Sequence, residues 1–209
     1  MSKWLWIAAC LALPLWSGER ESPATIVLYI DFEQDPSAVV LEALQQEAET
    51  IMAPMGTEFE WRSLQSVSGS EVSTQLAVVK FLGRCESSGV DVSHRAKAGA
   101  LGWTHVTDRT ILPFADIDCD GIRQFMHTGL ASVDWKDRSE AYGKAVGRVL
   151  AHELYHIFAN TGRHGSNGVG KAVYSVRDLL SREFHFEERE SEALRSNRIH
   201  PLETVDETH

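Results

Sequence analysis

The segment that most constrains this chain is a predicted buried helix over residues 139–160. Its apolar residues recur every three or four positions, as on a helix with one buried face: Val146, Val149, Leu150, Leu154, Ile157 and Phe158. Ser139 is the expected N-cap, and Asn160-Thr161-Gly162 is a stop signal in which Gly162 is free to take the left-handed conformation. A helix of this kind has to be covered by the rest of its domain.

Two histidines within this helix are candidate metal ligands. His152 and His156 are four residues apart, and Glu153 directly follows the first. Positions i and i+4 lie on the same face of a helix, so both imidazoles can point at one metal ion. In sites of this pattern the ion is zinc, and the glutamate takes a proton from a water at the metal.

His164, two residues after Gly162, is the expected third ligand. Alternatively, His164 is a loop histidine exposed to solvent and binds no metal. A glutamate on a following helix is the competing third ligand, and the candidates are Glu183, Glu187, Glu188 and Glu190. Segment 182–195 carries both charge signs, however, and is more simply predicted to be a solvated helix face.

These residues together resemble the metzincin clan of zinc peptidases, in which His-Glu-x-x-His on a helix is followed by a glycine turn and a third histidine. That histidine usually follows the second by six residues, whereas His164 follows His156 by eight. The clan also has a methionine-containing turn under the metal, and no methionine follows Met126 here. Tyr174-Ser175 lies about where that turn would fall and is the expected substitute; whether Tyr174 contacts the metal is left open.

The resemblance covers about residues 98–175 and implies both a fold and an activity. The implied fold is α+β and zincin-like, with a mixed sheet, an active-site helix and a small C-terminal subdomain. The implied activity is that of a zinc metalloendopeptidase, in which His152, His156 and His164 hold Zn²⁺ and Glu153 is the general base. The partner is then a peptide or protein substrate.

A short strand over 100–105 resembles the edge strand that lines the metzincin cleft. Gly102, Trp103 and Thr104 are therefore the expected substrate-binding residues, because an edge strand has unpaired backbone groups that can hold an extended peptide. An ordinary sheet strand is the equally weighted alternative. His105 is a weaker candidate for the cleft.

Two other functions remain open at this stage. One is a non-catalytic zinc-binding or adhesion module on a peptidase fold, which the altered ligand spacing favours and the presence of Glu153 opposes. The other is a zinc hydrolase of cell-wall peptides, which the motif does not distinguish from a protease.

Residues 1–18 are typical of a secretory signal peptide. Lys3 precedes an apolar run over residues 4–16, followed by Ser17-Gly18 and a charged stretch. We therefore expect a secreted or periplasmic protein whose single domain spans 19–209, with the last 15 or so residues as a flexible tail. An uncleaved N-terminal anchor is the alternative, although the apolar run is short for a membrane span.

Removal of that segment leaves Cys85 and Cys119, an even pair in an exported protein, and a disulfide is expected. Both cysteines follow strand-like runs, 75–84 and 110–115, so the bridge would join the ends of neighbouring strands. The alternative is a free thiol that blocks the zinc.

Composition and charge limit the possible partners. The chain is 43% hydrophobic, which is typical of a globular domain, and its formal net charge is −10. Nucleic acids and anionic membranes require a basic face, so neither is expected as a partner. We expect a monomer.

The first half of the chain predicts a strand, helix, strand unit over 24–32, 36–53 and 57–64, with the two strands parallel. The helix should bury Val39, Val40, Leu44, Ala48 and Ile51. Segment 116–121 somewhat resembles a calcium loop, but a turn with exposed acids is favoured because the full ligand spacing is absent.

Overall fold

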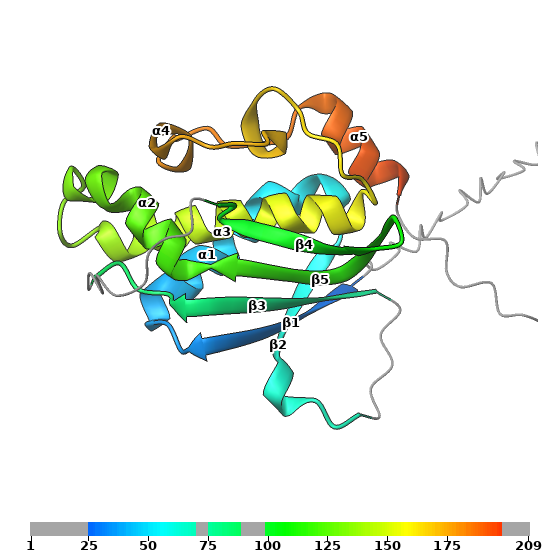
Figure 1. Cartoon of the computed structure of the whole chain (residues 1–209), viewed down its shortest axis with the longest axis horizontal. Coiled ribbons are helices and arrows are strands. Elements are labelled where there is room, and N and C mark those ends of the chain that lie inside the picture. The colour runs from blue at the N-terminus through cyan, green and yellow to red at the C-terminus, as the bar shows by residue number, and fades with distance from the viewer. Residues whose placement is uncertain (1–24, 70–74, 89–98, 198–209) are drawn as a thin grey trace, which may run out of the picture.

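The structure is a computed structural model and describes residues 25–69, 75–88 and 99–197 of the 209-residue chain. These residues form a mixed α+β fold in which helices pack on a sheet (Figure 1). The predicted signal peptide, 1–18, lies outside the described residues, as does most of the predicted tail. None of the described helices combines the length and the apolar character needed to cross a membrane.

The described strands form one sheet in the order β2-β1-β3-β5-β4. The strands are β1 (Thr25–Gln34), β2 (Glu58–Ser63), β3 (Leu76–Arg84), β4 (Gly102–Thr107) and β5 (Thr110–Asp118). Neighbours are parallel except for β4, which is antiparallel to β5 and forms an edge of the sheet. The parallel pairing of the first two strands is thus confirmed, and so is the edge position of the strand near 100–105.

Helices α1 (Ala38–Met52) and α3 (Arg138–Phe158) pack closely against each other and belong to the same core as the sheet. Two glycines of α3 permit this approach. A Cβ at Gly143 would lie 2.6 Å from the backbone oxygen of Val40, and one at Gly147 would lie 2.6 Å from that of Leu44. The predicted helix over 139–160 is α3, and it packs against both α1 and the sheet.

The core is built from strand residues that point toward these helices. Ile26 and Phe81 are fully buried on β1 and β3, and Leu44 and Leu150 are fully buried on α1 and α3. Burial of such side chains contributes about 1.5–3 kcal/mol each. This core fixes where the backbone of α3 lies and therefore where its side chains begin.

A disulfide joins Cys85 to Cys119, with a Cα–Cα distance of 4.9 Å. Cys85 directly follows β3, and Cys119 directly follows β5, the neighbour of β3 in the sheet. The bridge therefore ties the ends of neighbouring strands together, as predicted. Tyr142 of α3 donates a hydrogen bond to the Cys119 carbonyl oxygen at 2.8 Å, which links the same point to α3.

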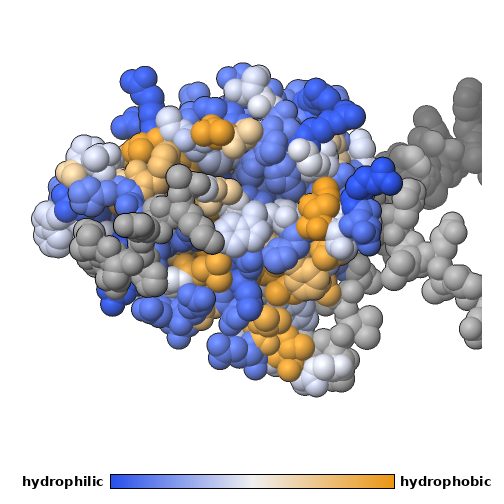
Figure 2. Space-filling view, in the orientation of Figure 1, coloured by the Kyte–Doolittle hydropathy of each residue, from blue (hydrophilic) through white to orange (hydrophobic). Residues whose placement is uncertain are grey.

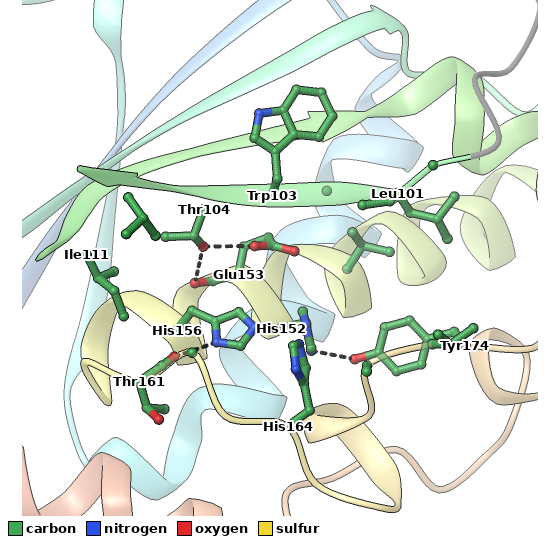
Figure 3. Close-up of a pocket in the computed structure, with 18 of the residues that line it drawn as sticks. Leu101, Trp103, Thr104, Ile111, His152, Glu153, His156, Thr161, His164 and Tyr174 are labelled. Atoms are coloured by element: carbon green, nitrogen blue, oxygen red, sulfur yellow. Dashed lines mark hydrogen bonds between the residues drawn. The ribbon is translucent and has the colours of Figure 1, made fainter. Parts of the chain in front are cut away.

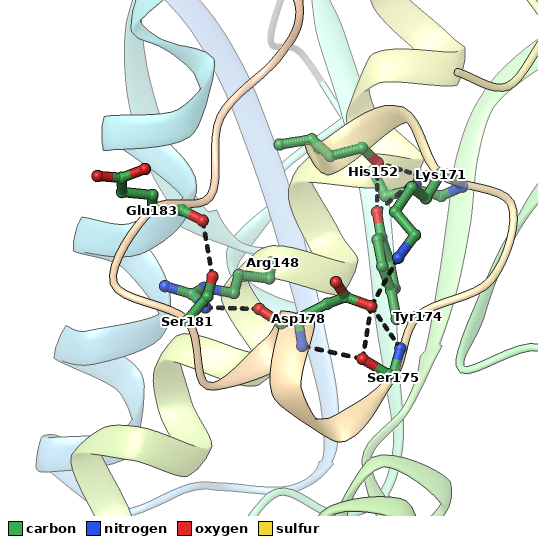
Figure 4. Close-up of polar contacts among 9 residues, drawn as sticks. Arg148, His152, Lys171, Tyr174, Ser175, Asp178, Ser181 and Glu183 are labelled. Carbon is green, nitrogen blue, oxygen red and sulfur yellow. Dashed lines mark hydrogen bonds and ion pairs between the residues drawn. The ribbon is translucent and has the colours of Figure 1, made fainter. Parts of the chain in front are cut away.

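After α3 the chain crosses back over the domain through three short elements, drawn from yellow to red in Figure 1. They are the 3-10 turn η3 (Gly168–Gly170) and the helices α4 (Val176–Leu179) and α5 (Glu188–Ser196). The buried Arg148 of α3 anchors this C-terminal segment (Figure 4). Its guanidinium donates to Glu47 of α1 at 2.7 Å and to the Asp178 carbonyl oxygen at 3.0 Å, and it lies 4.8 Å from the centre of the Phe184 ring.

Two predictions about helix residues are wrong. Val39 is 52% exposed, because the buried stripe of α1 runs through Val40, Leu44, Ala48 and Ile51, about 100° further round the helix. Ser139 is not the N-cap of α3, which begins one residue earlier, after Asp137. The Ser139 hydroxyl instead pairs with that of Ser87 at 3.0 Å.

Two segments differ from their expected structure. Residues 116–121 are neither a turn nor a calcium loop; they finish β5 and begin α2 (Cys119–Ala131), whose N-cap Asp118 accepts from the Gly121 amide at 2.8 Å. Segment 182–195 is helical only from Glu188 onward, and it buries Phe184, Phe186 and Glu190 rather than presenting a solvated face throughout. The first segment precedes Ile122, Met126 and Leu130, which recur at helical spacing, and in the second the apolar Phe184 and Phe186 lie among charged residues.

Candidate metal centre and cleft

Three histidines converge at the C-terminal end of α3. Within the described residues, one group of three or more His, Cys, Asp or Glu side chains lies close enough to hold a metal ion, and it consists of His152, His156 and His164. Their candidate ligand nitrogens all lie within 4.8 Å of one another. The first two are buried on α3, and the third is exposed on the loop that follows (Figure 3). The three predicted ligands are thus brought together.

Hydrogen bonds fix which ring nitrogens face the centre of this group. The Nδ1 atom of His152 lies 2.7 Å from the Val169 carbonyl oxygen, and that of His156 lies 2.6 Å from the Thr161 carbonyl oxygen. A carbonyl oxygen only accepts, so both Nδ1 atoms carry hydrogen and both Nε2 atoms present lone pairs. These Nε2 atoms are 3.1 Å apart.

Such an arrangement fits a zinc ion. Nitrogens about 2.0–2.1 Å from a tetrahedral centre are about 3.3 Å apart, close to the observed separation. Two facing lone pairs repel unless a cation lies between them. Burial lowers the pKa of His152 to about 4, although its bond to Val169 opposes the effect, and burial also lowers the pKa of His156. These three side chains are thus of a type and in positions that could hold a metal ion.

The loop between His156 and His164 supplies one of these carbonyl groups. Asn160 has a left-handed backbone, with φ of 45°, and the Thr161 amide bonds back to the His156 carbonyl oxygen at 3.1 Å. The chain thereby returns toward α3, and Thr161 faces the His156 ring. Gly162 is not left-handed, so that prediction is wrong, and Asn160 takes the conformation instead.

The other carbonyl group comes from η3. Gly168 has φ of 58°, and a Cβ there would lie 2.1 Å from the His185 backbone oxygen. Only glycine fits this position without a shift, and the turn that it permits directs the next carbonyl, that of Val169, at His152. The Val169 amide in turn donates to the His185 oxygen at 3.2 Å.

Tyr174 packs against the His152 ring on its Nδ1 side. Its ring meets the His152 ring edge-on, with centroids 5.6 Å apart. Its hydroxyl lies 3.0 Å from His152 Nδ1 and donates to the Val169 carbonyl oxygen. The hydroxyl is therefore on the side of the ring away from Nε2, and Tyr174 contacts His152 without joining the three nitrogens.

Glu153 lies beside the histidines with 4% of its surface exposed. Its Oε2 accepts a hydrogen bond from the Thr104 hydroxyl at 2.8 Å. Burial raises the pKa of Glu153 to about 7, and the bonds from Thr104 offset part of the rise. A carboxyl group tuned to near neutral pH suits proton transfer in both directions.

A cleft of about 560 Å³ runs past the histidines and Glu153 and along β4. Most of its lining residues are apolar or aromatic, and they include Leu101, Phe125, Val149, Ala172, Val173 and Tyr174. In Figure 2 the apolar surface on this face is broken into patches between hydrophilic residues. Phe125 and Val173 at the cleft are among the large apolar side chains that remain exposed, at 37% and 77%.

The expected substrate-binding residues differ in the direction of their side chains. Thr104 points at Glu153, whereas Trp103 projects to the other side of β4 (Figure 3). This follows from the alternation of side chains along a strand, so only the backbone of Trp103 lies along the cleft. Gly102 lets β4 pack closely on α3, since a Cβ there would lie 3.0 Å from Val149.

Several other candidates lie outside the site. His105 pairs with Asp116 at 2.9 Å and does not line the cleft. No glutamate of the described chain belongs to the three-histidine group, so Glu183, Glu187, Glu188 and Glu190 are not brought to it. Sequence reasoning missed Val169 and Thr161 as partners of the rings, because backbone carbonyls leave no residue-type signal.

In comparisons with known proteins, no family and no curated protein matches this sequence.

Proposed function

We propose that this protein is a zinc-dependent metalloendopeptidase with a zincin-like fold, in which α3 is the active-site helix. One observation carries the proposal: three histidine rings, two of them oriented by backbone carbonyls, converge beside a buried glutamate in an open cleft. A site that only stored zinc would not need a buried carboxyl group next to the ligands. His152, His156 and His164 would hold the ion, and Tyr174 and Val169 would orient the first of them.

The roles of the chain's own residues follow from their positions. Zinc, when bound, polarises the scissile carbonyl and lowers the pKa of a water to about 7. Glu153 accepts a proton from the attacking water and delivers it to the nitrogen of the leaving amine. Burial disfavours the protonated form of His152 and His156, and the carbonyl oxygens that bind their Nδ1 hydrogens would leave the Nε2 atoms to face the ion. The open edge of β4 would hold the substrate backbone in extended form.

The shape and lining of the cleft support a peptide with an apolar side chain next to the scissile bond. Among the described residues that line it, the only ionisable side chains apart from Tyr174 are Glu153 and the histidines. An apolar side chain gains about 25 cal/mol for each Å² removed from water. The disulfide supports action outside the cytoplasm, in keeping with the proposed signal peptide.

Zinc content is the first test. Elemental analysis of the purified protein should give one zinc per chain, and the His164→Ala variant should lose it or bind it at least about 10–100-fold more weakly. Glu183→Ala is the matched control, because Glu183 is exposed and outside the histidine group. Absence of zinc from the parent protein after reconstitution would refute the proposal.

Hydrolysis assays then separate the alternatives. The zinc-loaded protein should cleave denatured casein and quenched peptides with apolar residues, and Glu153→Gln should slow cleavage by about 10²–10⁴-fold while keeping zinc. Cleavage of peptidoglycan fragments alone would point to a cell-wall hydrolase. Zinc binding with no hydrolysis of either substrate would leave the non-catalytic module.

A further inference from the structure

The Thr104 hydroxyl makes a contact that the proposed chemistry does not by itself require. Oγ1 of Thr104 lies 2.8 Å from Oε2 of Glu153 and 3.2 Å from the Glu153 backbone oxygen, although the two residues are 49 positions apart in the chain. Figure 3 shows both contacts reaching from β4 across to α3. An edge strand and the active-site helix are thus joined at the candidate base itself.

A buried carboxylate needs a donor of this kind. Glu153 is 4% exposed, and no other described residue donates to its carboxylate. Without a bond the carboxylate could turn about its terminal torsion, which is broad for glutamate. With Oε2 held by Thr104, one orientation is selected, and Oε1 has no donor from the described chain and remains free to meet a water in the cleft.

We propose that Thr104 is a positioning residue for Glu153: its hydroxyl fixes Oε2 so that Oε1 alone receives the proton of the attacking water. This inference rests on the proposed function, because it assigns the base its orientation. The proton moves from the water to Oε1 and then to the leaving nitrogen, and Thr104 exchanges no proton.

The second contact lets the hydroxyl keep a partner throughout this cycle. When Glu153 carries the proton, its oxygens become weaker acceptors. The Thr104 hydroxyl can then turn toward the Glu153 backbone oxygen, which already lies within hydrogen-bond distance. A valine has the same shape and no such donor, so Thr104→Val removes only the hydrogen bond, and Thr104→Ser restores it.

Kinetics of the zinc-loaded protein test the catalytic consequence. Thr104→Val should lower kcat about 10–100-fold and leave KM within about threefold, since a misplaced base slows the chemical step. Thr104→Ser should recover kcat to within about threefold of the parent. A raised KM with unchanged kcat would overturn the proposal and assign Thr104 to substrate binding.

A double-mutant cycle in the metal-free protein tests the contact without any activity. Thr104→Val should shift the unfolding equilibrium at least about tenfold in the parent, and less than about twofold in a Glu153→Met background that lacks the acceptor. Equal shifts in both backgrounds would mean simple packing and would overturn the inference. Coupling in a protein that hydrolyses no peptide would uphold the contact and count against the proposed function.

Discussion

At the scale of single residues, two glycines near the histidines have opposite requirements. Gly168 is left-handed, with φ of 58°, and has no room for a Cβ, whereas Gly162 is not left-handed and has open space around it. Gly168→Ala should cost about 1–3 kcal/mol and move the Val169 carbonyl away from His152. Gly162→Ala should be neutral or stabilise by about 0.4–1 kcal/mol. Denaturant unfolding of the metal-free variants checks both signs, and equal effects would contradict the assignment of the turn to Gly168.

At the scale of elements, α4 is held by the carboxylate of Asp178. Its Oδ2 atom accepts hydrogen bonds from the Lys171 ammonium group and from the Ser175 amide and hydroxyl, each at 2.7 Å (Figure 4). Partial burial raises the pKa of Asp178, but these bonds outweigh it and lower the value to about 2. A lowered folded-state pKa contributes stability above the unfolded value of 3.8, and the contribution is lost as pH falls toward 2.

Asp178→Asn should therefore destabilise the protein by about 1–2 kcal/mol at pH 7, a value reduced for solvent screening. The difference from the parent should shrink as pH falls from about 4 toward 2. Unfolding measured across this range checks the sign, with Asp134→Asn as the control, because Asp134 is exposed and 3.8 Å from Lys136. A difference that grows in acid would show that Asp178 does not hold α4 in this way.

At the scale of the whole molecule, the disulfide joins two parts of the sheet that are 34 residues apart in the chain. Closing a loop of this length contributes about 2–4 kcal/mol. The paired Cys85→Ala and Cys119→Ala variant should lose that stability and still bind zinc, since the bridge is at a different place from the histidine group. Chemical unfolding and zinc content measure the two quantities separately, and a protein equally stable without the bridge would contradict this expectation.

Much of the fold and part of the site could be predicted from local pattern. The helix that carries His152 and His156 and the parallel first strands follow from residue spacing, and both are present in the structure. The edge position of β4 was suggested by the resemblance alone, with an ordinary sheet strand weighed equally, and it is present as well. Helix α2 was missed, although Asp118 before Ile122, Met126 and Leu130 is a capped helical pattern. The zincin-like fold and the zinc remain proposals.

Residue order alone puts two histidines on one helical face, with a glutamate beside them and a third histidine a few residues further on. These features are local, because helical periodicity sets their geometry. Three contacts depend on the packing of distant segments: Val169 with His152, Thr104 with Glu153, and Tyr174 with the Nδ1 side of the His152 ring. Such contacts join residues 17 to 49 positions apart, and their geometry depends on how the sheet, α3 and the C-terminal segment pack. No local pattern encodes that packing.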